Sequence, residues 1–106
     1  MIGPASSPWG AVRAKAGHPA PFTMTYVEVG NEDFFDKSGS YDQRFVQFTK
    51  AIKARYPTLK VVSSVGFEQP EPRRVRSVVP DMVDEHYYRT VDTFLKMSRG
   101  HSEKYD

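Results

Sequence analysis

The chain has 106 residues, of which 39% are hydrophobic and 26% charged, and its formal net charge is +2. This composition is typical of a folded globular protein and excludes a disordered or low-complexity chain. No apolar run is long enough to cross a membrane, so we expect no membrane partner. The absence of cysteine excludes disulfides and thiolate metal sites but fits either a reducing or an oxidising compartment. Residues 1–4 lack the charged and apolar regions of a signal peptide, so we expect none in this chain and its localisation stays open.

The first predicted elements are a helix and a strand. Ser7 is expected to cap the helix, with Pro8 in its first position and Gly17 as its stop. A strand is expected over residues 26–29, because this β-branched and aromatic run contains no proline and is stopped by Gly30.

A Gly-Asn-Glu turn follows that strand. Asn31 and Glu32 would then stand at the carboxyl end of a buried strand, which is where an α/β enzyme keeps its catalytic carboxylate. Glu32 is therefore the candidate acid. The same residues also suit an ordinary turn followed by a helix cap, since Gly and Asn are common in turns.

The next predicted element is a long helix that ends at Pro57. Ser40 and Gln43 predict a capping box at its start. Apolar residues then recur at helical spacing, so we expect this stripe to pack in the core. The stripe consists of Tyr41, Phe45, Phe48, Ile52 and Tyr56.

Two further strands and a closing helix are predicted. The strands are expected over residues 60–65 and 82–87, and Thr90 is expected to open the helix. Between the strands, residues 67–79 contain too many prolines for a full helix, so we predict an irregular loop above the site with a helical turn or two over residues 73–79. The closing helix carries Phe94, Leu95 and Met97.

The third predicted strand carries polar residues. Since side chains alternate along a strand, Asp84, His86 and Tyr88 should share one face. Val83, Glu85 and Tyr87 should share the other. Buried polar groups are costly unless paired, so the polar face predicts a hydrogen-bonded network beside a site. An exposed edge strand would also tolerate these charges.

Metal and other cofactors are not expected. Asp84, Glu85 and His86 are adjacent and should alternate between faces, whereas zinc needs three or four convergent ligands. We expect His18 to have a local role before Pro19, and His101 to face solvent on the last helix.

A nucleic-acid partner is not expected either. The basic cluster lies in one predicted loop without interleaved aromatic residues, which favours a solvated loop over a phosphate site. The cluster consists of Arg73, Arg74 and Arg76.

Several of these segments together carry a family resemblance. Residues 26–35, 39–45, 51–57 and 83–88, with the upstream residues 9–19, cover nearly the whole chain in one order. They resemble the catalytic domain of α-L-arabinofuranosidases of glycoside hydrolase family fifty-one. The resemblance implies an α/β fold, with about three parallel strands and flanking helices that correspond to strands four to six of a (β/α)₈ TIM barrel.

A barrel of this kind needs about 250 residues. Residues 1–106 are therefore expected to be a fragment of a single catalytic domain. Strands of such a sheet normally have neighbours on both sides, so open sheet edges make self-association possible.

The resemblance also implies an activity, the retaining hydrolysis of terminal arabinofuranosyl residues of arabinan or arabinoxylan. In that family the glutamate of the Gly-Asn-Glu turn is the general acid/base, a role that falls on Glu32. The preceding Asn31 would bind the sugar next to the scissile bond. His86 and Tyr88 would line the subsite and help to orient the nucleophile.

The family's nucleophile is a second glutamate, at the end of the seventh strand and beyond the segment that matches Tyr105 and Asp106. We therefore expect the isolated chain to be inactive, because a retaining glycosidase needs two carboxylates about 5 Å apart. Glu32 would also need a raised pKa to act as an acid near neutral pH. The remaining glutamates do not match the nucleophile motif and are Glu28, Glu68, Glu71, Glu85 and Glu103.

Two alternatives stay open. A noncatalytic carbohydrate-binding or interaction module with a degenerate site would bind arabinose without turnover. A different glycosidase of the same barrel clan would share the Asn-Glu turn, but the Glu-His-Tyr-Tyr match at residues 85–88 disfavours it.

Overall fold

The structure, a computed structural model, describes residues 1–66 and 68–98. Its centre is a parallel sheet of three strands in the order β1-β2-β3. The strands are β1 (Tyr26–Val29), β2 (Lys60–Ser63) and β3 (Met82–Val83). Val27 pairs with Val61 in β2, and Val62 pairs with Met82 in β3. The predicted α/β class with parallel strands is confirmed.

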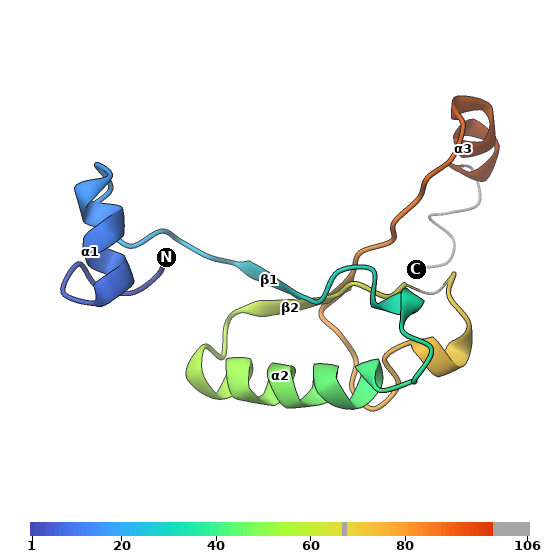
Figure 1. The fold of residues 1–106 in the computed structure, drawn as a ribbon, viewed down its shortest axis with the longest axis horizontal. Helices are drawn as coiled ribbons and strands as arrows, with labels where there is room; N and C mark the ends of the chain where they lie inside the picture. The colour runs from blue at the N-terminus through green and yellow to red at the C-terminus, as the bar shows by residue number, and fades with distance from the viewer. Residues whose placement is uncertain (67, 99–106) are drawn as a thin grey trace.

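In the described residues three helices accompany the sheet, α1 (Pro8–Lys15), α2 (Tyr41–Arg55) and α3 (Val91–Ser98), with short 3₁₀ turns at η1 (Asp33–Phe35) and η2 (Glu71–Arg73). Only α2 runs along the sheet, while α1 and α3 stand away from it at opposite ends of the molecule (Figure 1). The radius of gyration is 17.4 Å, whereas a compact domain of this length has about 13 Å. The described chain is therefore extended. None of its described helices has the length and apolar character to cross a membrane.

The first helix forms as predicted. The Oγ of Ser7 accepts a hydrogen bond from the backbone N–H of Gly10 at 3.1 Å, Pro8 follows, and Gly17 adopts a φ of 91° beyond the helix end. The buried Arg13 anchors the surrounding chain by donating to four backbone carbonyls. These belong to Met1, Gly3, His18 and Pro19.

The predicted capping box at the start of α2 is wrong. Ser40 occupies the N-cap position, but its φ of −77° and ψ of −12° are already helical, and its side chain caps no backbone N–H. A capping residue normally has extended backbone, which points its oxygen back at the helix. The Oγ of Ser40 instead donates to Oδ2 of Asp36 at 3.1 Å.

The core lies between α2 and the sheet. Its buried residues are Tyr41, Phe45, Val61 and Val65. Of the five predicted stripe residues, Tyr41 and Phe45 belong to it and Ile52 packs against it, whereas Phe48 is 55% and Tyr56 41% exposed. Phe48 lines an open groove beside β1, the edge strand of the sheet, so the expectation of core packing is wrong for these two residues.

Both later strands are shorter than predicted. β2 stops at Ser63, because the Oγ of this residue bonds the backbone N–H and C=O of Val65 in place of a neighbouring strand. β3 stops at Val83, and the backbone N–H of Asp84 makes the last bond to the sheet, with the carbonyl of Ser63 at 2.8 Å. Residues 84–88 continue without a neighbouring strand.

The loop between β2 and β3 is irregular, as predicted, but its helical turn is η2 and lies before most of residues 73–79. The later part of the loop is not helical because its backbone N–H groups bind the side chain of Asp42 in α2. Its Oδ1 accepts from the backbone N–H groups of Arg76 at 2.8 Å and Ser77 at 2.9 Å. Phe67, the first residue of the predicted loop, lies outside the described residues. α3 follows Thr90, whose Oγ1 accepts from the N–H of Thr93, as predicted.

Candidate active site

The turn after β1 has a strained backbone. Gly30 adopts a φ of 100° and Glu32 a φ of 52°, which places Glu32 in the left-handed region that side chains disfavour by about 1–2 kcal/mol. A Cβ at position 30 would lie 1.9 Å from Oδ2 of Asp33, so only glycine fits there. Such strain persists only where the surroundings hold the chain, which makes the turn a candidate functional element.

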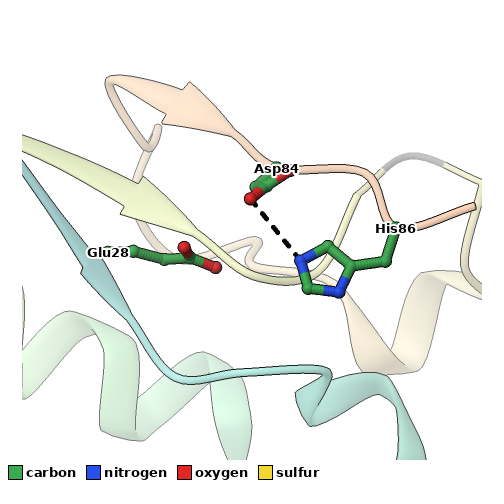
Figure 2. Close-up of side chains that lie close together, drawn as sticks. All are labelled: Glu28, Asp84 and His86. Atoms are coloured by element: carbon green, nitrogen blue, oxygen red, sulfur yellow. Dashed lines mark ion pairs between the residues drawn. The ribbon is translucent and has the colours of Figure 1, made fainter.

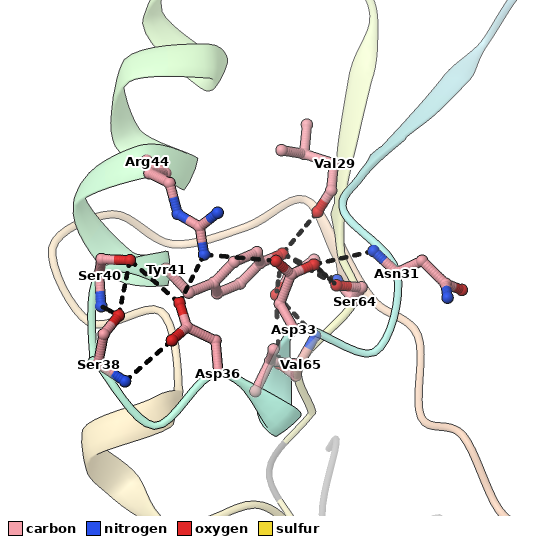
Figure 3. A network of polar contacts seen from close by, with 11 residues as sticks. Val29, Asn31, Asp33, Asp36, Ser38, Ser40, Tyr41, Arg44, Ser64 and Val65 are labelled. Atoms are coloured by element: carbon pink, nitrogen blue, oxygen red, sulfur yellow. Dashed lines mark hydrogen bonds and ion pairs between the residues drawn. The ribbon is translucent and has the colours of Figure 1, made fainter.

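Asp33 holds this turn in place. Its Oδ2 accepts from the backbone N–H of Asn31 at 2.8 Å and from the Oγ of Ser64 at 3.0 Å, and its Oδ1 lies 3.5 Å from the guanidinium of Arg44 (Figure 3). The turn is thus bonded to the end of β2 and to α2.

Tyr41 holds the strand ends together. Its side chain is almost fully buried, and its hydroxyl donates to the carbonyl of Val29 at 2.7 Å while accepting from the backbone N–H of Ser64 at 3.0 Å (Figure 3). The first residue of α2 therefore links the carboxyl ends of β1 and β2. The sequence indicated Tyr41 only as a core residue, because the partners of a hydroxyl group cannot be read from helical spacing.

Glu32 receives two hydrogen bonds from the segment that follows β3. Its Oε1 lies 2.6 Å from the hydroxyl of Tyr88 and 3.1 Å from Nδ1 of His86. These three predicted site residues therefore meet at the carboxyl edge of the sheet. Asn31 lies at the same edge, but its amide points away from the Asp33 network (Figure 3). In the part of the chain that the structure describes, no hydrogen bond joins that amide to the other three.

The electrostatics of Glu32 differ from the expectation for a general acid. Hydrogen bonds from Tyr88 and then His86 lower the pKa of Glu32 below its ordinary range. The same contacts with Glu32 raise the pKa of His86 and of Tyr88. The direction is downward because both groups that touch the carboxylate are donors, which favour its charged form.

A second acidic group lies beside His86. Nε2 of His86 is 3.5 Å from Oδ2 of Asp84, and the carboxylate of Glu28 reaches toward the same ring from β1 (Figure 2). Partial loss of hydration around its carboxyl group and the charge of Asp84 raise the pKa of Glu28, although the residue as a whole is exposed. Glu28 is not among the predicted site residues, although a charged residue inside a short strand, two positions before a strained turn, is a signal in itself.

One atom from each of Glu28, Asp84 and His86 lies within 4.8 Å of the others. Asp84 and His86 lie on one side of the chain, as the predicted alternation implies, and the third member, Glu28, comes from β1, which the argument from adjacent residues did not consider. Glu85 does diverge from them, and its Oε1 accepts from the backbone N–H of Glu68 at 3.2 Å. The absence of a metal stays a prediction.

The remaining histidines and the basic loop are separate from this site. His18 is exposed beside Phe22, as its expected local role implies, and His101 lies outside the described residues. In the loop, Arg73 donates to the carbonyl of Phe34 at 3.0 Å and Arg74 donates to that of Gln69. The absence of a nucleic-acid partner stays a prediction.

Comparison with known families decides the identity of the chain. A family model, the α-L-arabinofuranosidase 1 domain, matches residues 1–106. The chain belongs to this family. The resemblance to glycoside hydrolase family fifty-one α-L-arabinofuranosidases is thereby confirmed.

Named relatives of this chain agree. An extracellular exo-α-L-arabinofuranosidase of Streptomyces chartreusis is 42% identical over 98% of this chain and 13% of its own length. A probable α-L-arabinofuranosidase A of Emericella nidulans is 40% identical over 92% of this chain and 17% of its own length. The chain therefore spans less than a fifth of these relatives.

A solved structure is also similar, that of an arabinose-bound family fifty-one α-L-arabinofuranosidase. The two superpose with a TM-score of 0.68 at 40% identity, over 89% of this chain and 14% of the other.

Proposed function

We propose that this chain is the acid/base portion of a retaining α-L-arabinofuranosidase that removes terminal arabinofuranosyl residues from arabinan or arabinoxylan. Glu32 is the general acid/base, and Asn31, His86 and Tyr88 bind the sugar. The three strands correspond to strands four to six of a (β/α)₈ barrel, and residues 1–106 are a fragment of that single catalytic domain.

The observation that carries this proposal is the meeting of Glu32, His86 and Tyr88 at one edge of a parallel sheet. In the sequence, His86 lies 54 residues and Tyr88 lies 56 residues after Glu32. Barrel enzymes build their active sites from the loops at the carboxyl ends of their strands. A carboxylate held there by two donors, on a strained turn, fits a catalytic acid/base better than an ordinary turn.

The reaction has two steps, and Glu32 serves both. It first protonates the leaving oxygen while a second carboxylate attacks the anomeric carbon, and it then removes a proton from the water that releases the sugar. The hydrogen bonds from Tyr88 and His86 favour the charged form that the second step uses. For the first step, a neighbouring nucleophile carboxylate would raise the pKa of Glu32 by repulsion.

We propose that the isolated chain is inactive, since we assign none of the described glutamates as the nucleophile. Glu28 lies beside His86, where it faces Asp84. Glu85 contacts the segment after β2. Incubation of the chain with an aryl arabinofuranoside is therefore expected to give no turnover, and turnover that depends on Glu32 would contradict this.

The function itself can be tested in a chimera, in which this chain replaces the matching segment of the Streptomyces chartreusis enzyme. The chimera is expected to hydrolyse an aryl α-L-arabinofuranoside. Glu32→Gln should lower kcat/KM by about 10²–10⁴-fold, the usual contribution of a general acid/base. With a good leaving group, azide should restore turnover of Glu32→Ala and give the azide of retained configuration.

Glu71→Gln is the matched control, because it makes the same chemical change at an exposed position in the loop. It should leave kcat/KM unchanged. A folded chimera that lacks activity, or that keeps it after Glu32→Gln, would contradict the proposed role. Arabinose binding by a folded but inactive chimera would favour the noncatalytic module instead.

We further propose that the isolated chain self-associates. The face of the sheet opposite α2 carries Tyr26 at 55% exposure and Met82 at 49%. β1 and β3 are edge strands, and unpaired strand edges favour association. Sedimentation should show a mass that rises with concentration, whereas a strict monomer with uniform hydrogen-exchange protection would contradict this.

A further inference from the structure

The imidazole of His86 is held between carboxylates on both of its nitrogens. Nδ1 lies 3.1 Å from Oε1 of Glu32, and Nε2 lies 3.5 Å from Oδ2 of Asp84. The His86 side chain is only 21% exposed, so these contacts are partly shielded from water. A ring that donates from both nitrogens has one orientation and carries a positive charge.

Asp84 is well placed to set that orientation. It lies two residues before His86 on extended backbone, which brings both side chains to one side of the chain. The backbone N–H of Asp84 is itself bonded to β2, so its carboxylate projects from a fixed point. Figure 2 shows this carboxylate facing the ring edge, with Glu28 reaching toward the same ring from β1.

Glu28 supplies a second carboxylate close to the ring, with one oxygen within 4.8 Å of a ring nitrogen of His86 and of a carboxylate oxygen of Asp84. The titratable groups around the ring are thus Glu28 and Glu32 on the β1 side, and Asp84 and Tyr88 on the segment of His86 itself. Three carboxylates against a single imidazole favour its charged, doubly donating form. That form can donate to Glu32 through Nδ1 and to Asp84 through Nε2 at the same time.

We propose that Asp84, supported by Glu28, is a positioning residue that holds His86 with Nδ1 directed at the acid/base Glu32. This rests on the proposed function of Glu32. Asp84 does not touch the reacting atoms. It acts through His86, in the way that a carboxylate on one imidazole nitrogen fixes what the other nitrogen does.

The test is NMR on the 106-residue chain with ¹⁵N-labelled histidine. Wild-type His86 should titrate above the ordinary imidazole value of about 6.5 and show an imidazole proton protected from exchange. Asp84→Asn should move the His86 midpoint downward and lose that proton. Asp84→Glu should restore both in part, and Glu28→Gln should give a smaller downward shift. Asp92→Asn, the same change at an exposed position of α3, should alter neither.

Two results would overturn the proposal. One is a His86 that titrates at or below the ordinary imidazole value of about 6.5 in the wild-type chain, or that does not respond to Asp84→Asn. The other is a Zn²⁺-induced change at His86 that Asp84→Asn abolishes, because Asp84 would then be a metal ligand. Neither readout needs turnover, so failure here is distinguishable from an inactive chimera.

Discussion

The two faces of the sheet differ in burial, since one packs against α2 and the other is open. The face toward α2 buries Phe45 and Val61 completely. The opposite face exposes Tyr26, Met82 and the carboxylate of Glu28. Alternation along each strand separates the two sets, since successive side chains point to opposite sides. One face therefore supplies stability, while the other, with the loops at its carboxyl edge, presents the polar groups of the site.

The helices show the same contrast. α2 is joined to the sheet by apolar packing and by the hydroxyl of Tyr41. α1 and α3 stand apart, with Trp9 77% and Leu95 63% exposed. We infer that α2 and the strands form the most stable unit of the chain, because local stability follows the density of buried contacts.

The largest expected loss of stability comes from a substitution on the buried face. Phe45→Ala should lower the free energy of unfolding by about 3–5 kcal/mol, because it removes a fully buried ring and leaves a cavity. Phe48→Ala, three residues later on the same helix, should cost about 1 kcal/mol or less, since that ring is already 55% exposed. Urea denaturation of both variants measures the difference. Equal losses of stability would contradict this and would mean that the ring of Phe48 is as well packed as that of Phe45.

A smaller effect is expected where the two faces meet at the strand ends. Tyr41→Phe should cost about 1–3 kcal/mol, because it removes the hydroxyl that pairs the carbonyl of Val29 and the N–H of Ser64. Tyr56→Phe is the matched control at an exposed position and should be neutral. Denaturation reports the stability, and hydrogen exchange at Ser64 reports the local opening. An unchanged exchange rate at Ser64 would contradict the role of this hydroxyl.

The smallest expected effect is the pH dependence of stability that Glu32 and His86 contribute at the carboxyl edge of the sheet. The pKa of Glu32 is lowered, so its contribution to stability is present above 4.5 and is lost as the pH falls through the folded value. The pKa of His86 is raised, so its contribution is present below 6.5 and is lost as the pH rises through the folded value. The pair should therefore stabilise the chain most between these two pH values.

Denaturation across that range, with His86→Ala as the comparison, measures the contribution of the pair. The difference between wild type and variant should peak in the window and shrink on both sides. A difference that is constant with pH would mean that His86 contributes by packing alone.

Much of the local structure could be predicted. The limits of β1 and the cap and stop of α1 follow from short-range patterns, in which Ser7, Pro8 and Gly17 act on their own neighbours. The convergence of His86 and Tyr88 could be anticipated from alternation along extended chain, even though β3 is only two residues long. The position of Glu32 beside them was an expectation from the resemblance and from the common edge of parallel strands.

The rest depended on atoms that lie far apart in the sequence. Whether Ser40 caps α2 was decided by Asp36, and the role of Tyr41 by the ends of two strands. The orientation of the Asn31 amide likewise depends on the fold around the turn.

The sequence by itself determined which segments form strands and helices, and which residue types stand at the strand ends, because these follow from local backbone preferences and side-chain periodicity. Only the tertiary structure decided the charge environment of Glu32. The pKa of Glu32 falls because the fold brings Tyr88 and His86 within hydrogen-bonding distance of one of its oxygens. The fold likewise brings Glu28 of β1 next to Asp84 and His86. Electrostatic effects depend on distances of a few ångströms between separate segments, which residue spacing does not specify.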